Sequence, residues 1–171
     1  MPHSHCTTCG TAWPDLASAW PRTCSECRHS TWRNPVPVMV LLVPLADYPG
    51  QVLGVRRGIP PSVGGLALPG GYLESGETWR EGAVRELREE TGLVVNPHMV
   101  EHIAVESTPR NPDVLLVFGH VLVPQTFPHA FIPNEEVTSV EPVGLETMLA
   151  FPTHQEVARK YLRHPRWGAR G

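Results

Sequence analysis

The sequence predicts an α/β domain that is preceded by a small metal-binding module. Four cysteines in paired spacing lie between Cys6 and Cys27, apolar strand-like runs follow them, and a well-capped helix comes after a glycine-rich loop. A length of 171 residues suits one main domain with a small appendage. We therefore expect residues 1–34 to form the module and residues 35–171 to form the main domain.

The charge balance narrows the classes of function. The formal net charge is -3 and the pI is about 6.3, whereas nucleic-acid and membrane binders usually show a basic excess. Within residues 1–34, three arginines against two acidic residues are a weak basic footprint. The N-terminus has no apolar signal-peptide core, and the longest apolar run, 36–46, is too short to cross a bilayer. A cytoplasmic protein without a membrane span is the expectation.

The cysteines form two knuckles, Cys6-x-x-Cys9 and Cys24-x-x-Cys27. This spacing matches a structural tetrahedral Zn²⁺ site, in which the protein fills all four ligand positions. Two disulfides or a redox pair are the alternatives, which the missing secretion signal and the missing βαβ unit disfavour. We expect a zinc ribbon, with the nearby histidines as solvent-exposed bystanders: His3, His5 and His29.

Apolar runs after the cysteines predict strands. Residues 36–43 and 52–57 are expected to be buried strands joined by a turn at 48–50, and residues 99–107 and 114–123 to be further strands. The segment 66–77 is rich in glycine, which favours a sharply bending loop whose backbone comes close to a ligand.

The residues after this loop carry strong helix signals. Thr78 suits the N-cap, Glu81 completes a capping box, and Gly92 lies where a left-handed C-terminal residue belongs. A second helix is expected at 153–162, with Thr153 as its N-cap. The inward-facing stripe of the first helix comprises Ala83, Val84, Leu87 and Thr91.

Three glutamates crowd one face of the first helix. Glu86 precedes Glu89 and Glu90 by three and four residues, a spacing at which like charges repel by a few tenths of a kcal/mol per pair. A divalent cation such as Mg²⁺ removes this repulsion, because carboxylate oxygens on a rigid face suit it. A solvated acidic face is the alternative for the glutamates taken alone.

The residues around the glutamates complete a motif. From Gly71 to Leu93 the sequence agrees at every fixed position with G-x5-E-x7-R-E-U-x-E-E-x-G-U, where U is apolar. This stretch resembles the Nudix box. The resemblance, which covers residues 35–171, implies an α/β/α sandwich with a mixed sheet. It also implies hydrolysis of a diphosphate linkage in a nucleotide, with Mg²⁺ or Mn²⁺ as cofactor.

The resemblance assigns roles within the box. Glu86 and Glu90 would be the principal metal ligands, and Glu89 would complete the cluster as a ligand or by orienting the attacking water. The backbone carbonyl of Gly70 would add a metal contact. One ion pair would lock the loop against the helix: Arg85 with Glu77.

Other roles fall on residues outside these positions. In many family members the general base lies on a later loop, where Glu135 and Glu136 are the candidates and a solvated turn is the alternative. Arg57 or Arg56 either contacts a substrate phosphate or is an ordinary surface charge. Trp79 either stacks on a base or belongs to the core.

The substrate is the least determined part of the resemblance. A four-cysteine ribbon before the box is similar to NADH pyrophosphatases, but their S-Q-P-W-P-F-P-x-S signature is missing at 106–112. The Asn34-Pro35-x-Pro37 and 68–74 runs look closer to enzymes that act on ADP-ribose or FAD. An ADP-linked substrate is therefore expected. Members of the family that the chain resembles are commonly homodimers, so the resemblance also implies a homodimer. An RNA-directed role and a catalytically silent nucleotide sensor are the rivals, disfavoured by the acidic charge and by the intact glutamates respectively.

Overall fold

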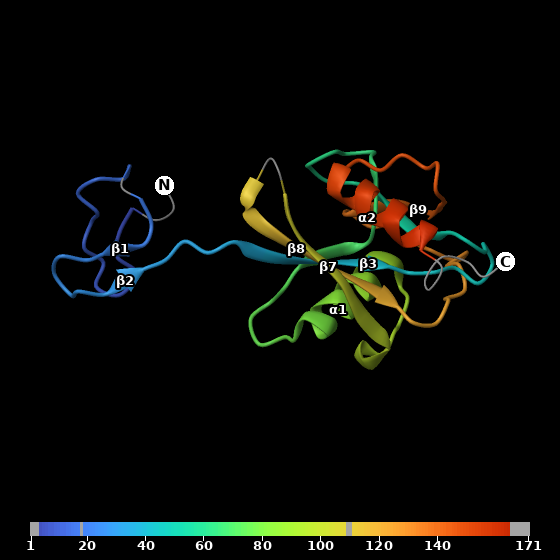
Figure 1. The fold of residues 1–171 in the computed structure, drawn as a ribbon, viewed down its shortest axis with the longest axis horizontal. Coiled ribbons are helices and arrows are strands. Elements are labelled where there is room, and N and C mark those ends of the chain that lie inside the picture. Colours follow the sequence, from blue (N-terminus) through green and yellow to red (C-terminus); the bar gives the residue numbers. More distant parts are fainter. Residues whose placement is uncertain (1–3, 18, 109–110, 165–171) are drawn as a thin grey trace. The chain divides into compact units, whose positions relative to one another are not determined.

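The computed structural model describes residues 4–17, 19–108 and 111–164 (Figure 1). His3, Pro109 and Arg110, which entered the sequence argument, lie outside the described residues. Contacts between Cα atoms divide the chain into two compact units, Met1–Pro35 and Val36–Gly171.

The N-terminal unit has little regular structure. Its strands β1 (Arg22–Thr23) and β2 (Ser30–Thr31) form a two-stranded antiparallel sheet. Among the described residues of this unit, the buried side chains are only Cys6, Arg22, Cys24 and Thr31. So small an interior offers almost no apolar core, and units of this size generally need a disulfide or a metal for stability.

The main sheet of the larger unit is mixed, as expected. Its order is β6-β3-β8-β7, in which β3 (Val36–Leu42) runs parallel to β8 (Asn111–Val121). The outer strands β6 (Gly70–Tyr72) and β7 (Val100–Thr108) pair antiparallel with β3 and β8 respectively. The central β3 is continuously apolar because helices cover both of its faces.

A second, antiparallel sheet has the order β5-β4-β9. It consists of β5 (Leu66–Ala67), β4 (Val52–Arg57) and β9 (Val137–Val143), and its β4–β9 register shifts between Arg56 and Arg57. A short 3-10 turn, η1 (Pro97–Met99), precedes β7. In the second sheet the end of β4 pairs with the start of β9, and β5, which belongs to the glycine-rich segment 66–77, pairs with β4.

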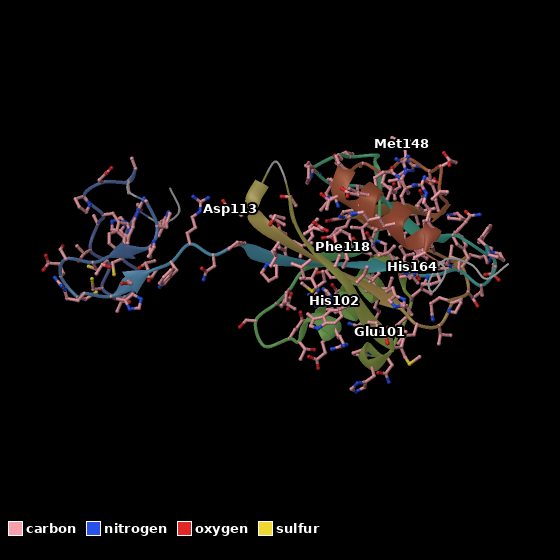
Figure 2. All side chains as sticks on the ribbon, viewed as in Figure 1. Glu101, His102, Asp113, Phe118, Met148 and His164 are labelled. Carbon is pink, nitrogen blue, oxygen red and sulfur yellow. The ribbon has the colours of Figure 1, made fainter. Side chains whose placement is uncertain are left out.

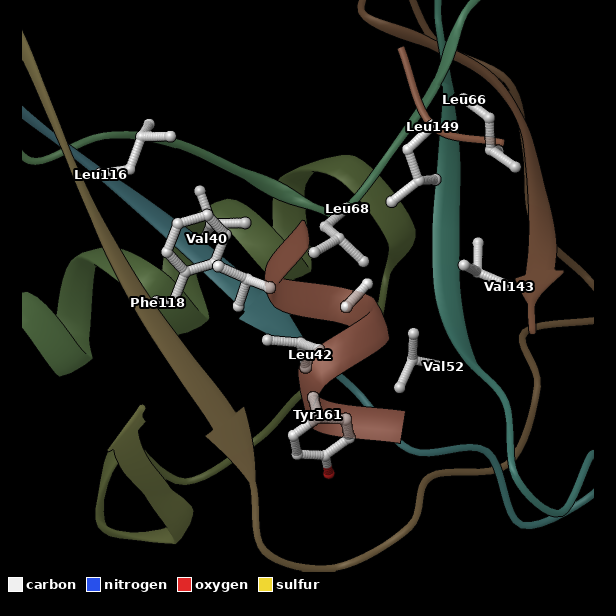
Figure 3. Packing of buried hydrophobic residues seen from close by; sticks show 12 residues of the cluster. Val40, Leu42, Val52, Leu66, Leu68, Leu116, Phe118, Val143, Leu149 and Tyr161 are labelled. Atoms are coloured by element: carbon white, nitrogen blue, oxygen red, sulfur yellow. The ribbon is translucent and has the colours of Figure 1, made fainter. Parts of the chain in front are cut away.

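Two helices complete an α/β/α arrangement, with α1 (Trp79–Thr91) and α2 (Pro152–Arg163) on opposite sides of the sheet (Figure 1). Alternate residues of the run 39–43 belong to different core clusters, one under each helix. Figure 2 places Phe118 in the middle of the larger unit. Figure 3 shows the cluster beneath α2, in which Val40, Leu42 and Phe118 pack near Tyr161.

The expected elements are present, but one helix end differs and three strands of the larger unit were not predicted. Strands β5 and β6 lie in the segment 66–77 that was expected to be a loop, and β9 lies where no strand was expected. The four expected strands and both helices are present within a few residues of their expected limits. Thr153 as the N-cap of α2 is wrong: the N-cap is Phe151, and its side chain makes no capping bond. Pro152 explains the earlier start, since its fixed φ suits the first helical position and it has no N–H to satisfy. Neither helix, nor any other in the described residues, could cross a membrane.

Candidate active site and metal centre

The glutamate-bearing helix α1 is fixed at both ends. Thr78 Oγ1 accepts a hydrogen bond from the N–H of Glu81, and the Glu81 carboxylate accepts one at 2.8 Å from the N–H of Thr78. At the other end Gly92 has φ 77°, and its N–H donates to the carbonyl of Arg88 at 2.8 Å. The capping box and the left-handed C-terminus are confirmed, so the glutamates stand on a rigid platform.

Glu90 is the most deeply buried carboxylate of the cluster, with 6% of the residue exposed. The N–H of Gly70 donates to Glu90 Oε2 at 2.8 Å, which joins the start of the glycine loop to the last turn of α1. Burial raises the pKa of Glu90 to about 8; the Gly70 N–H opposes this shift, and the charges of Glu86 and Glu136 add to it. A neighbouring cation would stabilise the ionised form of this buried carboxylate.

Glu86 lies against the backbone of the glycine loop. A Cβ atom on Gly71 would be 2.4 Å from the carboxyl carbon of Glu86, so only glycine permits this approach. Burial raises the pKa of Glu86, and Arg85 opposes that shift. The side chain of Glu86 is 13% exposed, whereas that of Glu89 is 51% exposed. Solvent exposure therefore increases from Glu90 through Glu86 to Glu89.

Arg85 connects the loop to the helix. Its Nε and Nη2 atoms donate to the two carboxylate oxygens of Glu77 at 2.7 and 3.0 Å, and Nη2 also donates to the carbonyl of Tyr72. Its Nη1 donates to Glu86 at 2.8 Å and to Glu89 at 3.1 Å. The ion pair of Arg85 with Glu77 that the resemblance implied is present, and it locks the loop against α1.

The loop before β9 approaches the same cluster. Glu136 is exposed, and its negative charge contributes to the raised pKa of both Glu86 and Glu90. Its backbone is held by the N–H of Gly58, which donates to the Glu136 carbonyl at 2.7 Å. Of the two candidates outside the box, Glu136 is thus the one whose charge acts on the glutamates of α1, and Glu135 is its neighbour on the loop.

The two arginines at the end of β4 have different partners. Arg56 makes two hydrogen bonds to the carboxylate of Glu141, at 2.6 and 2.8 Å, which also raise the pKa of its guanidinium. Arg57 donates to the carbonyls of the following loop, at 2.7 Å from Nε and 3.3 Å from Nη2. The positive charge of Arg57 partly opposes the upward shift in the pKa of Glu90. Of the two arginines, Arg57 is therefore the one whose charge acts on the glutamates of α1.

The sequence left the role of Trp79 open between base stacking and core packing, and it did not indicate a role for Asn134. Trp79 is half-buried, packs against the core cluster under α1 and meets the His102 ring edge-on at 6.2 Å, which favours the core reading. Asn134, which was not singled out, donates to the carbonyl of Glu89 at 3.2 Å. The signal that could have identified it is its place after Pro133 in a loop before a strand, where Asn is a common turn residue.

The four cysteines of the N-terminal unit meet at one point. Their Sγ atoms all lie within 4.8 Å of one another, with Cys6–Cys27 at 3.7 Å and Cys9–Cys24 at 3.6 Å. These distances far exceed the roughly 2.05 Å of a disulfide, and they match the ~3.8 Å between thiolates that share a tetrahedral zinc at ~2.3 Å. His5 and His29 are exposed and outside this group.

Hydrogen bonds lower the pKa of Cys6 and of Cys9, whereas burial and the neighbouring cysteines raise the pKa of Cys27 to about 12. The side chain and then the backbone N–H of Thr11 lower the pKa of Cys9 to about 6. The four thiol groups fit a soft four-sulfur metal site. The glutamates of α1 offer oxygen donors, which a hard cation prefers, but among the described residues the group whose ligand atoms come together closely enough to hold an ion is the four cysteines.

Comparison with known proteins identifies the family of the larger unit. The NUDIX domain model matches residues 35–164. An ADP-ribose pyrophosphatase from Methanocaldococcus jannaschii is 31% identical over 70% of this chain and 70% of its own length. A NAD-capped RNA hydrolase, NudC from Stutzerimonas stutzeri, is 26% identical over 92% of this chain, which spans about half (54%) of that relative.

Among solved structures, a Nudix hydrolase from Nitrosomonas europaea superposes with a TM-score of 0.66 at 24% identity, covering 97% of this chain and 95% of the other. At this identity the likeness shows the fold. Together with the complete box on α1, the family match shows that the chain belongs to the Nudix family of pyrophosphohydrolases.

Proposed function

We propose that this chain uses Mg²⁺ or Mn²⁺ to hydrolyse the diphosphate linkage of an ADP-linked nucleotide such as ADP-ribose, FAD or NADH. The observation that carries the metal requirement is the pair of Glu90, 6% exposed, and the partly buried Glu86. Among the described residues, no arginine or lysine forms an ion pair with Glu90. Buried carboxylates are costly without a cation, and oxygen donors on a rigid face are what Mg²⁺ prefers.

In this proposal Glu86 and Glu90 hold the metal, Glu89 completes the cluster and the Gly70 carbonyl adds an oxygen. When bound, the metal supplies charge neutralisation at the phosphates and polarisation of the attacking water. Water adds across one P–O–P linkage, which yields a nucleoside monophosphate and a second phosphorylated product. Gly71, which has no side chain, leaves the space that the Glu86 carboxylate occupies.

Two residues outside the helix serve the substrate and the water. Glu136 takes the proton of the attacking water, a role supported by its negative charge, which helps to raise the pKa of Glu86 and of Glu90. Arg57 contacts a phosphate: its bonds to loop carbonyls use Nε and one N–H of Nη2, and a guanidinium has five N–H donors. The same bonds hold Arg57 in one orientation.

The choice of an ADP-linked substrate rests on the relatives and on sequence runs. The ADP-ribose pyrophosphatase matches this chain over most of both lengths, and the runs at 34–37 and 68–74 look like enzymes that act on ADP-ribose or FAD. A second candidate is the NAD cap of RNA. It is favoured because the NudC match extends over 92% of this chain and so includes residues of the ribbon.

The N-terminal unit is proposed to bind one structural Zn²⁺ through Cys6, Cys9, Cys24 and Cys27, since their spacing and distances suit it. A homodimer is proposed as the assembly, and light scattering of the purified protein checks it: a mass near 18.9 kDa would contradict it.

The deciding experiment is turnover of a substrate panel with Mg²⁺ or Mn²⁺. The panel contains ADP-ribose, FAD, NADH, NAD-capped RNA, dinucleoside polyphosphates and nucleoside triphosphates. Wild type is compared with Glu90→Gln, which keeps an acceptor for the N–H of Gly70. Preferred turnover of an ADP-linked small molecule that Glu90→Gln abolishes supports the proposal.

The other outcomes each point elsewhere. Preference for NAD-capped RNA over free NADH establishes the second candidate. Nucleotide binding without hydrolysis by a folded, zinc-loaded protein overturns the enzymatic proposal in favour of a sensor.

A further inference from the structure

We propose that Asn134 is a positioning residue that fixes Glu136 against the glutamate helix. It does so by joining the loop before β9 to the C-terminal turn of α1. The inference rests on the proposed function, in which Glu136 receives the proton of the attacking water, and it adds a residue outside the Nudix box to the machinery.

On the loop side, Asn134 closes a tight turn around Glu136. Its Oδ1 accepts hydrogen bonds from the N–H of Glu136 at 2.9 Å and from the N–H of Val137 at 2.7 Å. Its own N–H donates to the carbonyl of Val137 at 2.9 Å. Val137 is 1% exposed, so the turn is anchored in the core immediately after Glu136.

On the helix side, the Nδ2 of Asn134 donates to the carbonyl of Glu89 at 3.2 Å. The last four carbonyls of a helix have no partner within the helix, and Glu89 is in the last turn of α1. Gly92 supplies the partner for the neighbouring carbonyl of Arg88. The Asn134 amide thus attaches the loop to the backbone of a residue inside the catalytic cluster.

A second attachment holds the same loop from the β4 side. The N–H of Gly58 donates to the Glu136 carbonyl at 2.7 Å, and a Cβ on Gly58 would be 2.3 Å from the carbonyl oxygen of Glu135. The backbone of Glu136 is therefore fixed through β4, through β9 and, by way of Asn134, through α1. Of these three attachments, the one through Asn134 is the one that connects the Glu136 backbone to the helix that carries Glu86 and Glu90.

The chemistry of the amide makes the proposal testable. A carboxamide offers an acceptor and a donor on one short side chain, so it can close the turn and reach the helix at once. In Asn134→Ser the hydroxyl still closes the turn, though more weakly, but it is too short to reach Glu89. Asn134→Ala loses both contacts. The two variants separate a role in the turn from a role in joining loop to helix.

The experiment measures kcat and KM for the preferred substrate in wild type, Asn134→Ser, Asn134→Ala, Glu136→Gln and the double variant of Asn134→Ser with Glu136→Gln. Thermal unfolding is measured alongside. We expect Asn134→Ser to lower kcat roughly 10- to 100-fold with KM within about twofold, because a misplacement of about 1 Å costs this much. Added to Glu136→Gln, Asn134→Ser should have no further effect, since it acts through Glu136. Multiplying effects, or a wild-type kcat in Asn134→Ser, would overturn the proposal.

Hydrogen–deuterium exchange of the loop 133–137 gives a readout that needs no substrate. Faster exchange in Asn134→Ser, with an unchanged melting temperature, is expected if the amide joins the loop to α1. Unchanged exchange overturns the inference even if the enzyme proves active. Conversely, faster exchange in a protein that hydrolyses nothing in the panel would leave the attachment standing and remove only the proposed function.

Discussion

The two units of the chain present their candidate metal ligands in opposite settings. In the N-terminal unit four thiol groups meet where the described residues offer almost no apolar core. In the larger unit three carboxylates stand on a helix that already packs against a sheet. The thiol set can close completely around an ion, whereas the carboxylates leave room for water and phosphate.

This difference teaches what each metal would do for the fold. Since its described residues form almost no apolar core, the N-terminal unit would obtain most of its folding free energy from the proposed Zn²⁺. The larger unit has two clusters of buried side chains, one on each face of β3, and these need no ion. Metal removal should therefore unfold the first unit and only inactivate the second.

The largest expected effect is on the N-terminal unit. Cys24→Ser removes a thiol that is 1% exposed, and we expect loss of the bound zinc and unfolding of residues 4–35. The lost binding free energy is of order 10 kcal/mol. Zinc content by mass spectrometry and NMR dispersion check this, with retained dispersion for residues 36–164 as the internal control. A folded, zinc-free first unit would break the comparison.

The next effect is on catalysis without unfolding. Glu90→Gln should lower kcat about 10³-fold or more, since a metal ion contributes several kcal/mol of transition-state stabilisation. Its metal-free melting temperature should match or exceed that of wild type, because a neutral amide replaces a buried carboxylate and keeps the contact with Gly70. Glu135→Gln, on the loop before β9, is the matched control with near-normal kcat. Unfolding of Glu90→Gln would contradict the idea of a pre-built platform.

The sequence predicted the local motifs of both units but not all of the contacts around them. The Nudix box and the paired cysteines were readable because their spacing is fixed by chemistry that acts over short stretches of chain. Strand β9 and the contact of Asn134 with Glu89 were not, because they depend on residues far apart meeting in space. Thr153 was misjudged as a cap because a local propensity gave way to Pro152. Local patterns predict candidate ligands, whereas the residues that position them depend on tertiary contacts.

A smaller effect concerns the core of the larger unit and its dependence on pH. Burial, with a contribution from Arg57, lowers the pKa of His154 to about 3, so the folded protein keeps this ring neutral. An unfolded histidine titrates near 6.5, so this stability is complete above pH 6.5 and is lost as the pH falls towards 3. The loss is up to about 1.4 kcal/mol per pH unit, or about 2 kcal/mol between pH 6.5 and pH 5.

The variant His154→Asn isolates this term, since it cannot titrate and its Oδ1 can still accept from the N–H of Leu68. Urea unfolding of both proteins at pH 6.5 and pH 5 should show wild type losing about 2 kcal/mol relative to the variant. A constant difference between the two pH values would mean that His154 gains its proton without unfolding.

The smallest expected effect is a difference in N-terminal capping between the two helices that flank the sheet. Thr78→Ala removes the hydroxyl that caps α1 and should cost about 1 kcal/mol in unfolding free energy. Thr153→Ala is the matched control on α2, where Phe151 is the N-cap and no side chain caps, so its cost should stay within about 0.5 kcal/mol. Because α1 carries the glutamates, fraying at Thr78 should also weaken Mn²⁺ binding, whereas the change at Thr153 should leave it unaltered. Equal costs in the two variants would show that capping does not distinguish the catalytic helix from the helix that only covers the core.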